Sequence, residues 1–256
     1  MGELFFRTLG EGKPMIILHG LFGSSDNWQT VAKKIGNHYE VYLVDQRNHG
    51  RSFQSDEFTY ELMIEDLRKL VEKEGLEDFI LLGHSMGGKV SMGYAMKYPE
   101  GIDKLIIADI APVKYQVHHD LILKALNEAY NTELKSRKQA EGIISKYIDN
   151  FSVKQFLLKN LHWVEKGKLG WKINIPVLSD QIVPISEWGS QIECIDIPTL
   201  FIRGGKSEYI TEEMYELIEE KFTDARIESI ENSGHWVHAE NPDEFYNLVM
   251  QFCLFG

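Results

Sequence analysis

Residues 79–87, FILLGHSMG, form the stretch that decides the fold of this chain. An apolar run of Phe, Ile and Leu stops at Gly83, and a pattern typical of a helix follows Gly87. Between them the chain reads G-x-S-x-G, which at a strand–turn–helix corner holds a serine hydroxyl clear of the backbone. Glycine suits both ends because a side chain would crowd the turn. A helix that begins behind Ser85 offers free N–H groups to a developing negative charge. We therefore predict that Ser85 is a nucleophile.

A second motif overlaps the first and belongs to a different class of protein. Residues 83–89 also read G-x-x-x-x-G-K, the start of a phosphate-binding loop. That loop needs Ser or Thr at the next position to bind Mg²⁺, and the chain has Val90 there. Ser91 is one residue late, so its side chain would point about 100° around the helix. This turn therefore favours a nucleophile over a nucleotide site.

Composition narrows the class of protein. The 256 residues suit one α/β unit with an insertion. The balance of 27 basic and 39 acidic residues gives a net charge of −12, which disfavours nucleic acid and anionic membranes as partners. The two cysteines, Cys194 and Cys253, are typical of reduced thiols. The sequence shows no signal peptide and no apolar stretch of the roughly 18 residues that a bilayer requires, so we expect a cytoplasmic protein without membrane insertion.

Strand and helix patterns alternate over most of the chain. Strands are predicted at Leu4–Leu9, Pro14–Leu18, Glu40–Val44, from Phe79 to the Ser85 turn, and at Lys104–Ile110, Pro198–Arg203 and Arg226–Ile230. Strands separated by helices indicate a mostly parallel sheet with helices on both faces. Residues 113–168 lack a clear buried strand and are rich in helix formers. We predict an α/β core of residues 1–112 and 190–256 with a helical cap inserted at 113–189.

A serine hydroxyl is a weak nucleophile until a base takes its proton. Of the nine histidines, His235 has the most informative context, because it follows the last predicted strand at the sheet edge that carries Ser85. The alternative for His235 is an ordinary surface loop histidine. His19 and His49 are expected to hydrogen-bond loop backbone, and His84 to support the Ser85 turn.

The base needs a carboxylate that orients it and holds its tautomer. Asp109 ends an apolar strand, where an unpaired carboxylate would be costly to bury. Glu208 follows the strand that ends at Arg203 and is the alternative acid. We favour Asp109. The oxyanion would need two N–H donors, for which we predict Met86, directly after the nucleophile, and Leu21, in the loop after Leu18.

Four segments together resemble one known family. HGLFGSSDNW (19–28), DQRNHGRS (45–52), GHSMGG (83–88) and SGHWVHAENP (233–242) fall in the order found in the α/β-hydrolase superfamily, and the chain is similar to its small bacterial carboxylesterases. The resemblance implies the α/β-hydrolase fold, with Ser85 as nucleophile, His235 as base, and Leu21 and Met86 as oxyanion donors. Residues 45–52 would brace the site. Ser207 stands where the superfamily usually has its acid, whereas the esterase subgroup has one in ADIAP, which supports Asp109.

The expected activity is hydrolysis of short- to medium-chain acyl esters through a Ser-His-Asp triad and an acyl-enzyme, with no metal or cofactor. An acyl thioesterase, including the acyl-CoA type, or a carbon–carbon bond hydrolase would use the same triad. A hydrolase-fold binding protein would usually have lost Ser or His. The expected partner is a small-molecule acyl ester. The side chains predicted to contact it are Phe22, Tyr115, Phe156, Trp163 and Trp236.

Overall fold

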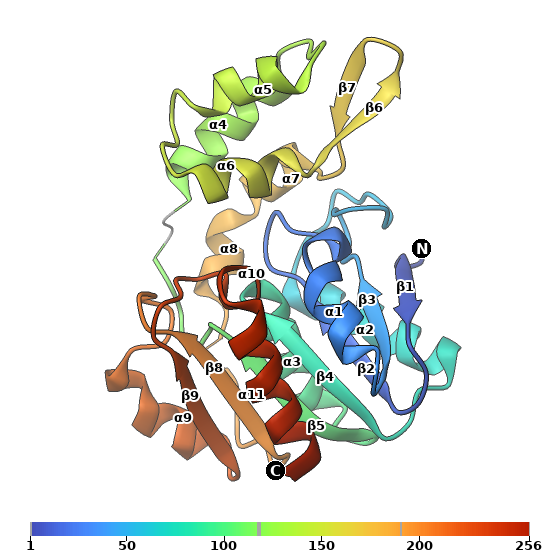
Figure 1. The fold of residues 1–256 in the computed structure, drawn as a ribbon, viewed down its shortest axis with the longest axis vertical. Helices are drawn as coiled ribbons and strands as arrows, with labels where there is room; N and C mark the ends of the chain where they lie inside the picture. Colours follow the sequence, from blue (N-terminus) through green and yellow to red (C-terminus); the bar gives the residue numbers. More distant parts are fainter. Residues whose placement is uncertain (1, 117–118, 190, 256) are drawn as a thin grey trace.

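The computed structural model describes residues 2–116, 119–189 and 191–255. In these residues a seven-stranded sheet of order β1-β3-β2-β4-β5-β8-β9 forms the centre of the molecule (Figure 1). Its strands are β1 (Phe6–Leu9), β2 (Pro14–Leu18), β3 (Glu40–Val44), β4 (Phe79–His84), β5 (Ile102–Ala108), β8 (Thr199–Gly204) and β9 (Ala225–Ile230). β1 runs antiparallel to β3, and each further pair of neighbours runs parallel. The predicted mostly parallel sheet is confirmed.

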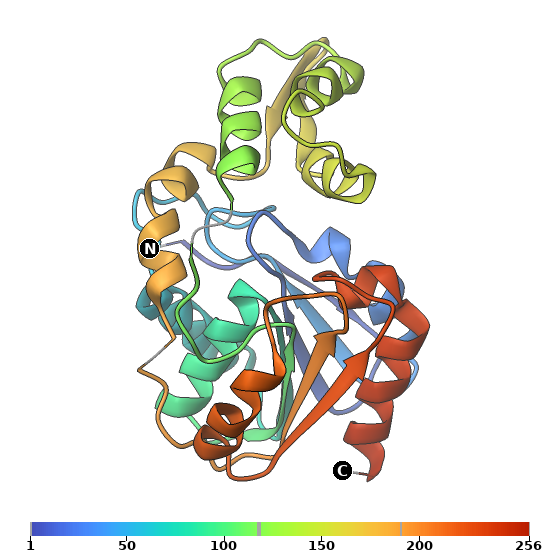
Figure 2. The same cartoon turned by 90° about the vertical axis from the view of Figure 1, so that its left-hand side faces the viewer.

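Helices cover both faces of the sheet, as Figure 2 shows with the strands between them. One face packs against α1 (Gln29–Ile35) and α11 (Pro242–Phe255), and the other against α2 (Tyr60–Glu74), α3 (Met86–Lys97) and α9 (Tyr215–Lys221). Because successive strand residues point to opposite faces, Ile17 lies in the apolar cluster beneath α1 and α11, and Ile16 lies in the cluster beneath α2, α3 and α9. This two-sided burial explains why the strands read as continuous apolar runs. Short helical turns complete the core: η1 (Ser25–Asn27), η2 (Glu212–Met214) and α10 (Val237–Glu240).

The chain leaves the sheet between β5 and β8. It forms α4 (Asp120–Tyr130), α5 (Arg137–Ile144), α6 (Phe151–Leu158), β6 (Leu161–Glu165), β7 (Lys168–Trp171), α7 (Ile175–Asp180) and α8 (Ile182–Glu187). Figure 1 shows α4 to α7 and the β6–β7 pair gathered at one end of the molecule. The division of the chain at 112/113 and 189/190 into core and cap stays a prediction.

One part of this insertion is not helical. β6 and β7 pair antiparallel, with Glu165 opposite Lys168 and Gly167 in the turn at a φ of +84°. The side chains of β6 are mostly exposed, so the hairpin lacks the buried apolar run that signals a core strand. Lys166 and Gly167, between the two short strands, are a local signal for a hairpin turn. The prediction of a helical cap did not take this signal into account.

Among the described residues, none of the helices has both the length and the apolar character needed to cross a bilayer. The cytoplasmic location stays a prediction.

Candidate active site

The carboxyl ends of β4, β5 and β8 lie side by side, and the candidate residues stand directly after them. The Ser85 amide donates to the Ala108 carbonyl at 3.0 Å, and the Asp109 amide donates to the Ile202 carbonyl at 2.8 Å. These bonds extend the parallel ladders by one residue, so Ser85 and Asp109 occupy neighbouring positions at one edge of the sheet.

Ser85 occupies a strained corner between β4 and α3. Its backbone has φ +52° and ψ −119°, a region that costs a non-glycine residue roughly 1–3 kcal/mol. A Cβ on Gly87 would lie 2.5 Å from the Leu18 carbonyl oxygen, and a Cβ on Gly83 would overlap the Gly87 carbonyl. Both glycines are therefore required by the close approach of neighbouring backbone, which is the steric reason expected from the sequence.

Two backbone amides beside Ser85 are available to a ligand. Within the part of the chain that the structure describes, the Met86 amide at the start of α3 and the Leu21 amide donate to no protein group. Leu21 lies in a turn closed by the Gly23 amide, which donates to the Gly20 carbonyl at 3.0 Å. Leu21, Ser85 and Met86 all line one cavity. The structure thus brings together the serine and the two donors predicted for an oxyanion.

Two buried histidines hold the turn that carries Leu21. The Nδ1–H of His19 donates to the Gly20 carbonyl at 2.8 Å, and its Nε2 accepts the Gln46 amide at 3.0 Å. Nε2 of His49 accepts the Phe22 amide at 3.2 Å. Burial lowers the pKa of His49 to about 3 and also lowers that of His19, so both rings are neutral. The expectation that these two histidines bond loop backbone is confirmed.

His235 and Asp109 are in direct hydrogen-bond contact. Nδ1 of His235 lies 2.8 Å from Oδ2 of Asp109, which is fully buried. The Gly204 amide donates to the other Asp109 oxygen at 2.9 Å, and the Ser207 hydroxyl donates to Oδ2. Glu208, the alternative acid, has an exposed side chain. Of the two candidates, the structure brings Asp109 to His235.

Sequence reasoning missed the contact between Ser207 and Asp109. The only signal was that Ser207 stands at the usual position of the acid after β8. Its hydroxyl donates to Oδ2 of Asp109, the same oxygen that contacts Nδ1 of His235.

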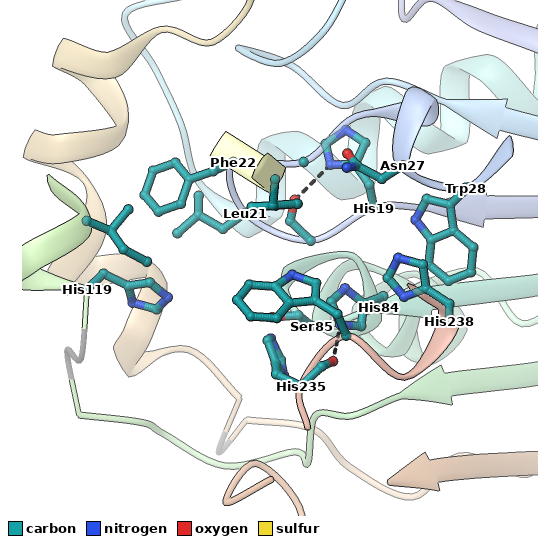
Figure 3. Close-up of a pocket in the computed structure, with 15 residues that line it drawn as sticks. His19, Leu21, Phe22, Asn27, Trp28, His84, Ser85, His119, His235 and His238 are labelled. Carbon is teal, nitrogen blue, oxygen red and sulfur yellow. Dashed lines mark hydrogen bonds between the residues drawn. The ribbon is translucent and has the colours of Figure 1, made fainter. Parts of the chain in front are cut away.

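The loop that carries His235 is held from three sides. The His235 ring stacks on the Tyr209 ring, with centroids 4.0 Å apart and an angle of 22° between the ring planes. The Glu240 carboxylate accepts the Gly234 amide at 2.7 Å. Nε2–H of His84 donates to the His235 carbonyl at 2.8 Å, which Figure 3 shows as a dashed line. Burial, with His235 nearby, holds the pKa of His84 well below its ordinary value, so His84 acts as a neutral donor.

Two cavities meet at Ser85. The first, named here the His235 cavity, is lined by His235, Trp236, Phe22, Phe156, Ile122 and His84 among others (Figure 3). The second, named the Lys89 cavity, is lined by Lys89, Met86, Tyr60, Tyr115, Gln116 and Tyr209 among others. Ser85 and Leu21 line both. An ester carbonyl at Ser85 could extend one group into each cavity.

Four of the five predicted contact residues line these cavities. Phe22, Phe156 and Trp236 belong to the His235 cavity and Tyr115 to the Lys89 cavity. The expectation for Trp163 is not supported: this side chain is 60% exposed on the β6–β7 hairpin and lines neither cavity. The β6 residues from His162 to Glu165 are all exposed, so the hairpin holds Trp163 in solvent.

Comparisons with known proteins find relatives that match over most of the chain. A family model described as "alpha/beta hydrolase fold" matches residues 13–145. Esterase YbfF of Escherichia coli is 38% identical over 240 residues, which cover 93% of this chain and 92% of the relative. The sn-1-specific diacylglycerol lipase ABHD11 of Danio rerio is 34% identical over 255 residues, covering 96% and 80%. The solved structure named "Marine microorganism esterase" has a TM-score of 0.95 and 43% identity, covering 98% of this chain and all of that one.

Proposed function

The chain belongs to the α/β-hydrolase family and is a carboxylic ester hydrolase, and on this premise we propose that it cleaves short- to medium-chain acyl esters through a Ser85-His235-Asp109 triad. The observation that carries the triad is the 2.8 Å contact between His235 and the buried Asp109, beside the cavity that Ser85 shares with His235.

Each residue has a distinct task in this mechanism. Asp109 accepts the Nδ1–H of His235 and leaves Nε2 as the base. Nε2 takes the hydroxyl proton of Ser85 while Oγ attacks the acyl carbonyl carbon. The amides of Leu21 and Met86 donate to the oxygen that becomes negative in the tetrahedral intermediate. Nε2–H then protonates the leaving alcohol, and the acyl-enzyme forms.

Water completes the cycle by the same route. Nε2 of His235 takes a proton from water as its oxygen attacks the acyl-enzyme carbonyl, and the proton returns to Oγ of Ser85 as the acid leaves. Ser207 and the Gly204 amide hold the Asp109 carboxylate in place throughout. The aromatic lining of the His235 cavity favours an apolar group of modest size on that side of the ester.

The first experiment compares hydrolysis of p-nitrophenyl butyrate by the wild type and by Ser85→Ala. We expect kcat to fall by about 10⁶-fold in the variant, because alanine lacks the hydroxyl that would form the acyl-enzyme. Ser145→Ala, an exposed serine that lines neither cavity, is the control and should keep wild-type kcat. A kcat of Ser85→Ala near that of the control would refute the assignment of Ser85 as the nucleophile. A folded wild type that cleaves a butyryl thioester or a carbon–carbon bond, but no ester, would refute the substrate class.

A further inference from the structure

Lys89 is a buried cation beside the candidate nucleophile. It stands four residues after Ser85 on α3, lines the Lys89 cavity and is only 2% exposed. Its Nζ donates to the Trp188 carbonyl, and the Ser186 carbonyl lies 3.5 Å away. Among the described residues no carboxylate forms an ion pair with it. Lys89 is therefore a buried charge without a counter-ion.

Nζ of Lys89 also lies 4.9 Å from the ring centroid of Tyr115 and 5.9 Å from that of Tyr60, contacts that stabilise a cation but do not neutralise its charge. Burial of an ammonium group without a carboxylate is costly, and here it lowers the pKa of Lys89 to about 7. A methionine of similar length would fill the same space without that cost. A cation held in a cavity next to a nucleophile is the pattern of a group that meets a ligand.

Other polar groups of the same cavity are also donors. Within the described residues, the hydroxyls of Tyr60 and Tyr209 have no hydrogen-bond partner, although both side chains line the cavity. Burial raises the pKa of both, so each hydroxyl keeps its proton at neutral pH. The nearby carboxylate of Asp109 is already occupied by His235, Gly204 and Ser207. Among the described lining residues, the cavity thus offers a lysine and two hydroxyl donors and no carboxylate.

The place of His235 indicates which part of an ester meets this cavity. His235 lines the His235 cavity and is absent from the lining of the Lys89 cavity. The leaving alcohol takes its proton from His235, so its oxygen has to lie on that side. The acyl group then extends the other way, past Met86 and toward Lys89.

We propose that the Lys89 cavity is the acyl subsite and that it receives an acyl chain ending in a carboxylate, so that the enzyme prefers monoesters of dicarboxylic acids. This inference rests on the proposed function and narrows its substrate class. The carboxylate would accept charge-assisted hydrogen bonds from Nζ of Lys89 and neutral ones from the tyrosine hydroxyls.

The test compares esters that carry no charge, a charge on the acyl chain, or a charge on the alcohol. Ethyl butanoate is the neutral ester, monoethyl succinate carries a carboxylate at the end of the acyl chain, and 3-(butanoyloxy)propanoate carries it on the alcohol. The series continues with monoethyl glutarate and adipate against ethyl pentanoate and hexanoate. We expect kcat/KM for at least one diacid monoester to exceed that for its neutral partner by about 10-fold or more, because a charge-assisted hydrogen bond contributes about that factor. The alcohol-side carboxylate should bring no gain.

The variants make the assignment to Lys89 specific. In Lys89→Met the ratio of kcat/KM between charged and neutral partner should fall to about one, and a ratio cancels any general loss of activity. Tyr60→Phe, which removes only a hydroxyl, should lower the ratio by a smaller factor. This variant replaces Lys89→Met in the test if Lys89→Met does not fold. Lys97→Met, an exposed lysine on the same helix, should keep the wild-type ratio. The wild-type ratio should also be larger at pH 6 than at pH 8.5, because Lys89 loses its proton between them.

The outcomes separate the two proposals. Hydrolysis of the neutral esters with no diacid preference, or a preference that survives in Lys89→Met, overturns the acyl subsite and leaves the triad standing. A preference for the alcohol-side carboxylate reverses the assignment of the cavities. Turnover that persists in Ser85→Ala overturns the proposed function itself.

Discussion

At the scale of single residues, the candidate site gathers backbone strain. Phe22, Ser85 and Asp109 have φ values of +60°, +52° and +50°, which non-glycine residues rarely adopt. Each conformation costs roughly 1–3 kcal/mol and persists only where neighbouring contacts hold it. The amides of all three donate hydrogen bonds to neighbouring groups, at 3.2, 3.0 and 2.8 Å. In these conformations Ser85 lines both cavities and the Asp109 carboxylate contacts His235.

Replacement of each candidate acid by its amide tests the role of Asp109. We expect Asp109→Asn to lower kcat for p-nitrophenyl butyrate by about 10⁴-fold, because an amide no longer holds His235 in the productive tautomer. Glu208→Gln should stay within about twofold of the wild type, since an exposed surface carboxylate contributes little. Both variants are checked for folding by thermal unfolding. An active Asp109→Asn beside an inactive Glu208→Gln would assign the acid to Glu208.

At the scale of elements, the insertion between β5 and β8 is attached to the turn that carries Leu21. Asn160, between α6 and β6, is 2% exposed, and its Nδ2 donates to the Phe22 carbonyl at 2.8 Å. Nδ2 also donates to the Leu157 carbonyl at 3.2 Å, at the end of α6. One amide therefore joins the end of a helix in the insertion to the backbone beside the predicted oxyanion donor.

Asn160→Leu tests whether this link matters for catalysis. Its loss leaves a buried carbonyl unpaired, so we expect the free energy of unfolding to fall by about 1–3 kcal/mol. If the link positions the Leu21 amide, kcat/KM should also fall by about 10-fold, as expected for a displaced oxyanion donor. Asn131→Leu is the control, because the Asn131 amide is exposed and bonds only within its own helix. Lower stability with unchanged kcat/KM would limit Asn160 to a structural role.

At the scale of the whole molecule, several buried histidines are kept neutral around the site. His19, His49, His84 and His238 are each 4% exposed or less. Burial lowers the pKa of all four, to about 3 for His49 and His238. His238 stacks on Trp28 with centroids 3.9 Å apart, and Figure 3 shows the two rings together at one side of the His235 cavity. Protonation of these rings would place unpaired charge in the core.

The protein should therefore lose stability in mild acid. Because the folded pKa values lie below the unfolded value of about 6.5, the unfolded state binds more protons below that pH. Stability is then complete above about pH 6.5 and falls by about 2 kcal/mol for each of His49 and His238 by about pH 5. Asp26 and Glu65, whose ion pairs and hydrogen bonds with basic groups lower their pKa to about 2, add to the loss only below about pH 4.

Thermal unfolding from about pH 7.5 to about pH 5 measures this effect. We expect Tm to fall steeply across the range and the fall to be shallower in His49→Gln, which can still accept the Phe22 amide. His38→Gln replaces an exposed histidine and should leave the slope unchanged. A Tm that stays constant over this range would show that the buried rings do not titrate on unfolding.

The sequence by itself determined the features that depend on a few neighbouring residues. The apolar runs and helical spacings predict the mostly parallel sheet, and Gly83 and Gly87 predict the sharp turn at Ser85, because strand periodicity and backbone crowding act locally. The same local motifs, in order, identify the family.

Only the tertiary structure decided that Asp109 rather than Glu208 contacts His235, 126 residues further along the chain. It also decided that Trp163 faces solvent and that Lys89 is buried with no carboxylate partner among the described residues. These contacts depend on strand order and on how the insertion packs against the sheet, and no local pattern encodes them.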